Sequence, residues 1–103
     1  MRKLKSKPLF TISVAAELTD SHPRTLMLYE QRGVLHPART ATNRRLYSPQ
    51  NIAEIRFIQH LTQKYGINLA GVKIIQKAIK FCRLHKVDLR KELFPEFKEP
   101  DIF

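Results

Sequence analysis

Three arginines flank one short polar stretch in the middle of the chain. Arg39 precedes residues 40–43, and Arg44 and Arg45 follow them. A guanidinium group forms paired hydrogen bonds to a phosphate, and phosphate contacts supply most of the sequence-independent affinity of proteins for nucleic acid. We therefore expect this cluster to lie along a phosphate backbone. The alternative is an ordinary hairpin with solvated arginines.

A second candidate group lies in residues 21–33, with the sequence SHPRTLMLYEQRG. Ser21 or His22 can cap a helix at this point. Pro23 suits the first turn, where its missing N–H would have no partner, and Gly33 permits a left-handed stop. The pattern predicts a short helix.

Leu26 and Tyr29 fall on one side of this predicted helix at helical spacing. The other sides carry Arg24, Thr25, Leu28 and Gln31. Such a helix suits the DNA major groove, where the base edges offer hydrogen bonds. We expect His22, Arg24 and Thr25 to face base edges. A small solvated surface helix is equally compatible with this stretch alone.

The sequence on either side supplies the elements that would hold this helix. Thr11 or Ser13 can cap a first helix that ends near Leu18, and residues 19–21 form a turn. Helix, turn and second helix project the second helix from a compact body. A β-hairpin with its tip near residues 40–43 would then place the three arginines beside that helix as a wing.

Two longer helices are predicted downstream. Ser48 and Pro49 are typical of a helix start, and that helix covers residues 50–65. Its apolar stripe is expected in the core and consists of Ile52, Ile55, Ile58, Leu61 and Tyr65. Asn68 can cap the next helix, residues 69–84, whose apolar arc is wider than one packing contact needs. We expect part of that arc to meet a second copy of the chain, through Ile74, Ala78, Phe81 and Leu84.

The chain is expected to have three parts. Residues 1–8 are a basic leader without regular structure in the free protein, and residues 9–86 are the DNA-binding domain. In the tail, residues 87–103, Asp88 can cap a short helix to about Phe94. The tail aromatics either complete the core or a dimer contact, or they form a docking segment for another protein.

The composition favours a polyanionic partner. The chain has 103 residues, enough for one domain, and a formal net charge of +10. Residues 1–87 carry 16 basic and 4 acidic side chains, whereas residues 88–103 carry 3 and 5. No apolar run approaches the roughly 20 residues of a membrane-spanning helix, and no signal-peptide pattern opens the chain. We expect a cytosolic protein that binds nucleic acid and no membrane.

Catalysis and metal binding have little support in the residue types. The acidic residues before Asp88 lie on separate predicted elements and are Glu17, Asp20, Glu30 and Glu54. No nucleophile has a base beside it, and no glycine loop could hold a phosphate. Cys82 excludes an internal disulfide, and with His85 it supplies only two of the four ligands that zinc needs. We expect no enzyme activity, no metal and no cofactor.

A series of short motifs runs in unbroken order through about residues 9–80. They are Ile12-Ser13-Val14-Ala15-Ala16-Glu17-Leu18, His22-Pro23, Thr25-Leu26, Tyr29-Glu30, Gly33, Pro37-Ala38-Arg39-Thr40, Arg45 with Tyr47-Ser48, and Gly66-Ile67-Asn68-Leu69-Ala70-Gly71-Val72. Together they resemble the MerR family of winged helix-turn-helix regulators. The last motif is similar to the HspR-type heat-shock repressors within that family.

The resemblance implies a mainly α-helical winged helix-turn-helix, with about four helices, a hairpin wing and a short C-terminal segment. It also implies a homodimer that represses chaperone or heat-shock genes from an inverted repeat, at the bacterial nucleoid in the cytoplasm. An Hsp70-type chaperone is the implied co-repressor. The residues expected at DNA are Ser13, His22, Arg24, Thr25, Leu28, Tyr29, Arg39, Arg44, Arg45 and Tyr47. The two tyrosines and the three wing arginines are expected on the phosphate backbone. The alternative for Tyr29 is a place mostly in the core, with only its hydroxyl at the DNA.

The recognition helix, residues 21–33, departs from the family pattern. Met27 stands where the family usually has arginine, and Leu28 replaces a polar or aromatic residue. Arg24 is placed to supply the lost cation. The short C-terminal extension makes a small-molecule effector unexpected. Two other functions stay open: an architectural protein that bends or lines DNA, and an adaptor whose tail docks a chaperone.

Overall fold

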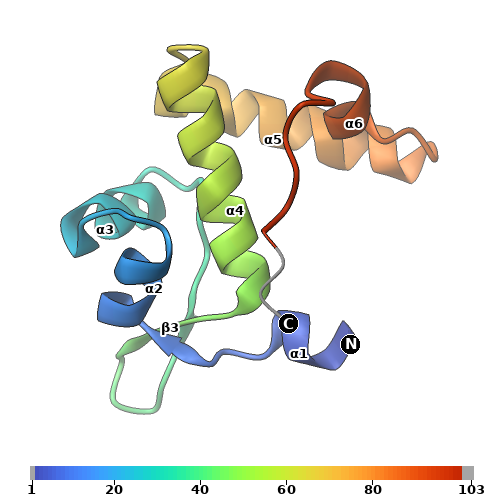
Figure 1. Ribbon diagram of the computed structural model, residues 1–103. Helices are drawn as coiled ribbons and strands as arrows, with labels where there is room; N and C mark the ends of the chain where they lie inside the picture. The colour runs from blue at the N-terminus through green and yellow to red at the C-terminus, as the bar shows by residue number, and fades with distance from the viewer. Residues whose placement is uncertain (1, 101–103) are drawn as a thin grey trace.

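The computed structural model describes residues 2–100, which form a mainly helical body with a small antiparallel sheet. In chain order the elements are α1 (Arg2–Ser6), β1 (Phe10–Thr11), α2 (Ile12–Leu18), α3 (Pro23–Gln31), β2 (Ala38–Arg39), β3 (Arg45–Tyr47), α4 (Pro49–Gln59), the π-helical turn η1 (His60–Lys64), α5 (Leu69–Leu84) and α6 (Leu89–Leu93). Figure 1 shows α4 in the middle of the molecule, with α2 and α3 to one side and α5 across the C-terminal end of α4. The predicted mainly helical, winged helix-turn-helix fold is confirmed.

Side-chain caps begin the principal helices where the sequence predicts them. The capping residues are Thr11 for α2, His22 for α3, Ser48 for α4, Asn68 for α5 and Asp88 for α6. Each accepts a hydrogen bond from a backbone N–H of the first turn that has no partner within the helix. Gly33 follows α3 at a φ of 76°, the left-handed conformation in which a side chain would be strained. The ends of the recognition helix are therefore determined locally.

The helix α4 and the turn η1 supply the centre of the core. Ile52, Ile55, Ile58 and Leu61 are all buried, as predicted. Tyr65 was predicted in the same stripe, and that prediction is wrong, because the side chain is 45% exposed. At His60 the α-helix gives way to η1, whose i→i+5 hydrogen bonds widen the turn and rotate the following residues away from the stripe.

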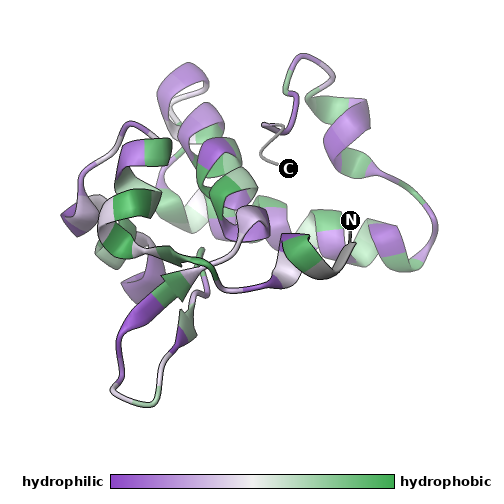
Figure 2. Cartoon of the chain, turned by 60° about the horizontal axis from the view of Figure 1, so that its bottom comes forward, coloured by the Kyte–Doolittle hydropathy of each residue, from purple (hydrophilic) through white to green (hydrophobic). Residues whose placement is uncertain are grey.

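The sheet has the strand order β1-β3-β2, with both pairs antiparallel. The predicted hairpin is present: Ala38 pairs with Leu46 and Arg39 with Arg45, and Figure 2 shows it projecting from the body. The strand β1 was not predicted, because two residues are too short to show a period. Its pairing of Phe10 with Tyr47 ties the start of α2 to the base of the wing.

The leader is more ordered than the sequence predicts, and Phe94 and Phe97 of the tail follow the first of the two predicted alternatives. The leader was expected to lack regular structure, but Arg2–Ser6 form α1. This helix contains the half-buried Leu4 and packs against α4. At the other end, the rings of Phe94 and Phe97 lie 5.6 and 5.2 Å from the ring of Phe57, so these two aromatics complete the core. Ile102 and Phe103 lie outside the described residues.

Glu96 fastens the tail to η1. Its carboxylate accepts hydrogen bonds from His60 Nε2 at 2.6 Å and from the Tyr65 hydroxyl at 2.8 Å. The bond from His60 is the main cause that lowers the pKa of Glu96 from its ordinary 4.5 to about 2. The tail is thus held by a charged hydrogen bond in addition to its aromatic packing.

This contact predicts a pH-dependent contribution to stability. A carboxyl with a lowered pKa stabilises the folded state while it is ionised, so the contribution is present above pH 4.5 and is lost as the pH falls towards about 2. We expect the difference in Tm between the wild type and Glu96→Gln to shrink across that interval. Glu92→Gln, on an exposed residue of α6, is the matched control. A Tm difference for Glu96→Gln that does not change with pH would contradict this contact.

Candidate nucleic-acid interface

The recognition helix α3 has one face in the core and one face towards solvent. Leu26 and Tyr29 are buried, and Leu26 has no exposed surface. On the opposite side, six residues line one shallow surface hollow: His22, Arg24, Thr25, Met27, Leu28 and Gln31. Four of these were predicted at DNA, namely His22, Arg24, Thr25 and Leu28. The structure places all four together on the exposed face.

The turn before α3 is held by polar side chains of α4 whose role was not predicted. Thr19 is fully buried, and its hydroxyl donates to the carbonyl oxygen of Ala15 at 2.8 Å. Its own carbonyl oxygen accepts from Gln59 Nε2 at 2.8 Å, and Arg56 Nη2 donates to the carbonyl oxygen of Leu18 at 2.8 Å. Because α4 is the central helix of the core, these bonds fix the orientation of α2 and α3 relative to the core.

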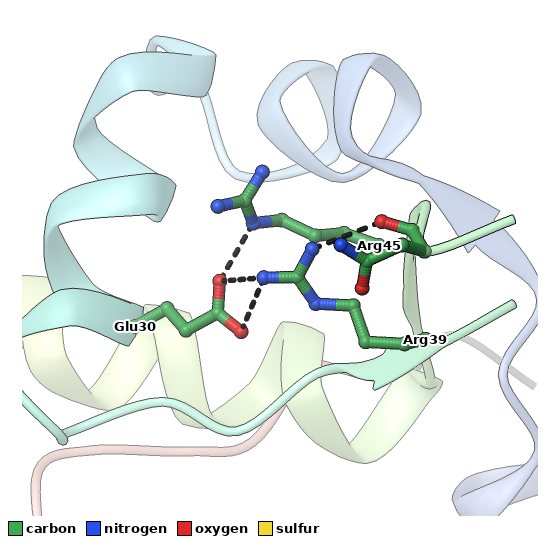
Figure 3. Close-up of polar contacts among 4 residues, drawn as sticks. Glu30, Arg39 and Arg45 are labelled. Carbon is green, nitrogen blue, oxygen red and sulfur yellow. Dashed lines mark hydrogen bonds and ion pairs between the residues drawn. The ribbon is translucent and has the colours of Figure 1, made fainter.

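Glu30 joins the recognition helix to the wing (Figure 3). Its carboxylate accepts a hydrogen bond from Arg45 Nε at 2.6 Å and two from Arg39 Nη2 at 3.0 and 3.1 Å. Arg39 Nη1 also donates to the carbonyl oxygen of Asn43 at the hairpin tip, at 3.0 Å. Burial alone would raise the pKa of Glu30, but the hydrogen bonds and charges of the two arginines outweigh it and lower that pKa. The carboxylate therefore stays ionised and holds the wing against α3.

The three wing arginines are consequently not equivalent. Arg39 and Arg45 face Glu30, and part of each guanidinium is committed to that carboxylate. Arg44 is exposed, and within residues 2–100 its guanidinium forms no ion pair and no hydrogen bond. Of the three wing arginines, Arg44 is the one whose guanidinium donors are all available to an external anion.

Both tyrosines predicted on the phosphate backbone lie in the core. Tyr47 is fully buried, burial raises its pKa, and its hydroxyl has no hydrogen-bond partner among the described residues. This position does not reach the surface, contrary to the prediction, because the Tyr47 side chain lies on the core side of β3, at the point where Tyr47 pairs with Phe10 of β1. Tyr29 is also buried, and burial raises the pKa of its hydroxyl.

Comparison with known proteins agrees with this arrangement. The family model described as MerR HTH family regulatory protein matches residues 10–79, which include the helix-turn-helix, the wing, α4 and most of α5. The chain belongs to the MerR family. Its described helices include none that is long and apolar enough to cross a membrane.

Two kinds of MerR-family relative are similar to this chain. The heat shock protein HspR of Streptomyces coelicolor is 48% identical over 68 residues, which is 66% of this chain and 45% of HspR. The chain thus matches less than half the length of that relative. The HTH-type transcriptional regulators GlnR of Bacillus anthracis and Bacillus cereus are each 31% identical over 110 aligned positions, covering 96% of this chain and 84% of GlnR. The two GlnR proteins are transcriptional regulators by name.

The MerR-family chain exposes an apolar strip on α5. Val72 and Ile79 are buried and mark the face of that helix that packs on the core. On another face Ile74, Phe81 and Leu84 are 68%, 63% and 77% exposed, and Ala78 between them is half-buried. These four residues, the α5 strip, are the ones predicted to meet a second copy.

The remaining predicted groups fall at separate places. Ser13 is exposed in the first turn of α2. Cys82 is a half-buried free thiol, and His85 Nδ1 lies 3.1 Å from the carbonyl oxygen of Phe81. Within residues 2–100 no three His, Cys, Asp or Glu side chains gather as a metal site would require.

Proposed function

We propose that this MerR-family protein is a cytoplasmic repressor that binds, as a homodimer, an inverted repeat near chaperone or heat-shock genes. The observation that carries the proposal is the exposed polar face of α3, fastened through Glu30 to a wing that presents Arg44. The similarity to HspR supports the choice of genes, because that relative is named a heat shock protein and is 48% identical over 66% of this chain. Residues 9–86 would bind DNA. A partner such as an Hsp70-type chaperone would contact the outer surface of the tail, since Phe94 and Phe97 pack on the core.

In this proposal α3 enters the major groove and the wing follows the adjacent backbone. Arg24 reaches base edges, where arginine pairs with the O6 and N7 atoms of guanine. Ser13, at the exposed start of α2, and Arg44 contact phosphates, which set the register without sequence information. Arg39 and Arg45 act mainly by positioning the wing on Glu30.

Arg24→Ala is expected to reduce discrimination between operator and random DNA by about 1–3 kcal/mol. Binding to random duplexes should change much less, because the lost contact is to a base. Fluorescence titration against both duplexes measures the two affinities. Arg83→Ala is the control, since it removes the same exposed charge from α5. Equal losses of affinity for the two duplexes would contradict a contact between Arg24 and a base.

Arg44→Ala is expected to weaken binding to operator and random DNA alike. The loss of one phosphate contact should reduce the slope of log K against log salt by about 0.9. Titrations at four or five salt concentrations give that slope, again with Arg83→Ala for comparison. If the slope of the Arg44 variant equals that of the wild type, the wing tip does not contact the backbone.

The regulated genes are tested with promoter DNA. The purified protein should shift a fragment from a chaperone promoter of its own source organism at lower concentration than a housekeeping promoter of equal length. It should also lower transcription from that chaperone promoter in a purified system. Equal binding to both fragments would contradict the proposed gene class.

A further inference from the structure

Two apolar side chains interrupt the polar outward face of α3. Met27 and Leu28 are 40% and 39% exposed, and both line the same hollow as Arg24. Residues three and four positions apart are neighbours on a helix surface, so Met27 and Leu28 both lie one turn after Arg24. The exposed face therefore presents one cation followed by two apolar groups.

The major groove offers one apolar group to such a face. Phosphates and the hydrogen-bonding edges of all four bases are polar, whereas thymine alone carries a C5-methyl group in that groove. A thioether and an isobutyl group have no strong hydrogen-bond donor or acceptor with which to replace the water on polar base edges. Contact with a methyl group buries apolar surface on both sides.

We infer that Met27 and Leu28 determine specificity by contacting thymine methyl groups, so that each half-site carries thymines beside the base pair reached by Arg24. This inference rests on the proposed function and specifies the DNA that the same site binds. Each methyl contact is expected to change affinity by about fourfold, since a buried methylene group contributes a comparable transfer free energy.

Deoxyuridine provides the test, because it pairs with adenine like thymine and lacks only the methyl group. The probe is the duplex that the protein enriches from a random library, with each thymine replaced by deoxyuridine one position at a time. We expect about fourfold weaker binding at particular thymines of the half-site and no change elsewhere. In Met27→Ala or Leu28→Ala, deoxyuridine should no longer weaken binding at the thymine that the truncated side chain contacts.

The variants are chosen to leave the fold intact. Both positions are exposed, and alanine has the highest helix propensity. Leu93→Ala truncates an equally apolar exposed side chain on α6 and should keep the wild-type deoxyuridine profile. Circular dichroism confirms the helix content of all three variants before titration.

Two results would overturn the inference while leaving the proposed function intact. In the first, the wild type enriches one duplex but tolerates deoxyuridine at every position. In the second, the same thymines matter equally to the wild type, to Met27→Ala and to Leu28→Ala. If no duplex is enriched, sequence-specific binding itself fails and the inference fails with it.

Discussion

Replacing Phe81 with lysine is expected to convert the protein to a monomer and to weaken operator binding by about a hundredfold or more, the usual gain from linking two binding sites. Phe81 is 63% exposed within the α5 strip, and its ring contacts only His85 among the described aromatic rings. A lysine at this point would put a charge into an apolar contact between two copies. The added positive charge cannot itself weaken binding to DNA.

The Phe81→Lys experiment needs two measurements in one buffer. Light scattering gives the oligomeric state, and titration against the inverted repeat and one isolated half-site gives the affinities. The half-site affinity should be nearly unchanged. Leu93→Lys makes the same change at an exposed apolar residue of α6 and should remain dimeric. A Phe81→Lys protein that is still a dimer would exclude the α5 strip as the contact.

The second large effect is on stability. Leu26→Ala is expected to lower the free energy of unfolding by about 2–5 kcal/mol, because Leu26 is fully buried and the cavity would lie under the recognition helix. For a domain of this size that corresponds to a fall in Tm of well over 5 °C, at roughly 4–8 °C per kcal/mol.

Leu28→Ala is the matched control for this prediction. It makes the same substitution two residues later in α3, on the exposed face, and should change stability by no more than about 0.5 kcal/mol. Urea denaturation followed by circular dichroism gives both free energies. Equal effects of the two substitutions would show that α3 does not pack as described.

The features predicted correctly from sequence depend on residues close together in the chain. Caps such as His22 and Asn68, and the stop at Gly33, act within one helical turn, so their positions need no knowledge of the tertiary structure. The buried stripe of α4 follows from its helical period. The hairpin follows from its polar tip and flanking strands.

The features that sequence reasoning missed depend on contacts between distant residues. Glu30 meets Arg45 fifteen residues away, and Gln59 meets Thr19 forty residues away. A polar residue within an otherwise buried stripe, such as Gln59, was the signal for the second contact. Tyr47 is buried where β3 pairs with the two-residue strand β1, which the sequence did not predict.

These long-range contacts explain why the interface is built as one unit. Arg56 and Gln59 hold the turn, Gln76 Nε2 donates to the carbonyl oxygen of Val34 beyond α3 at 2.9 Å, and Glu30 holds the wing. The recognition helix is thereby fixed at its beginning, its end and its side. Such preorganisation lowers the ordering cost when DNA is bound.

The central claim is that two copies of this interface bind one inverted repeat. The most direct measurement is selection of bound sequences from a random duplex library, with the oligomeric state determined by light scattering in the same buffer. We predict a dimer that enriches a single inverted repeat, with half-sites about one helical turn, or ~34 Å, apart. A monomer that enriches direct repeats, or no sequence at all, would contradict the claim and favour an architectural or adaptor role.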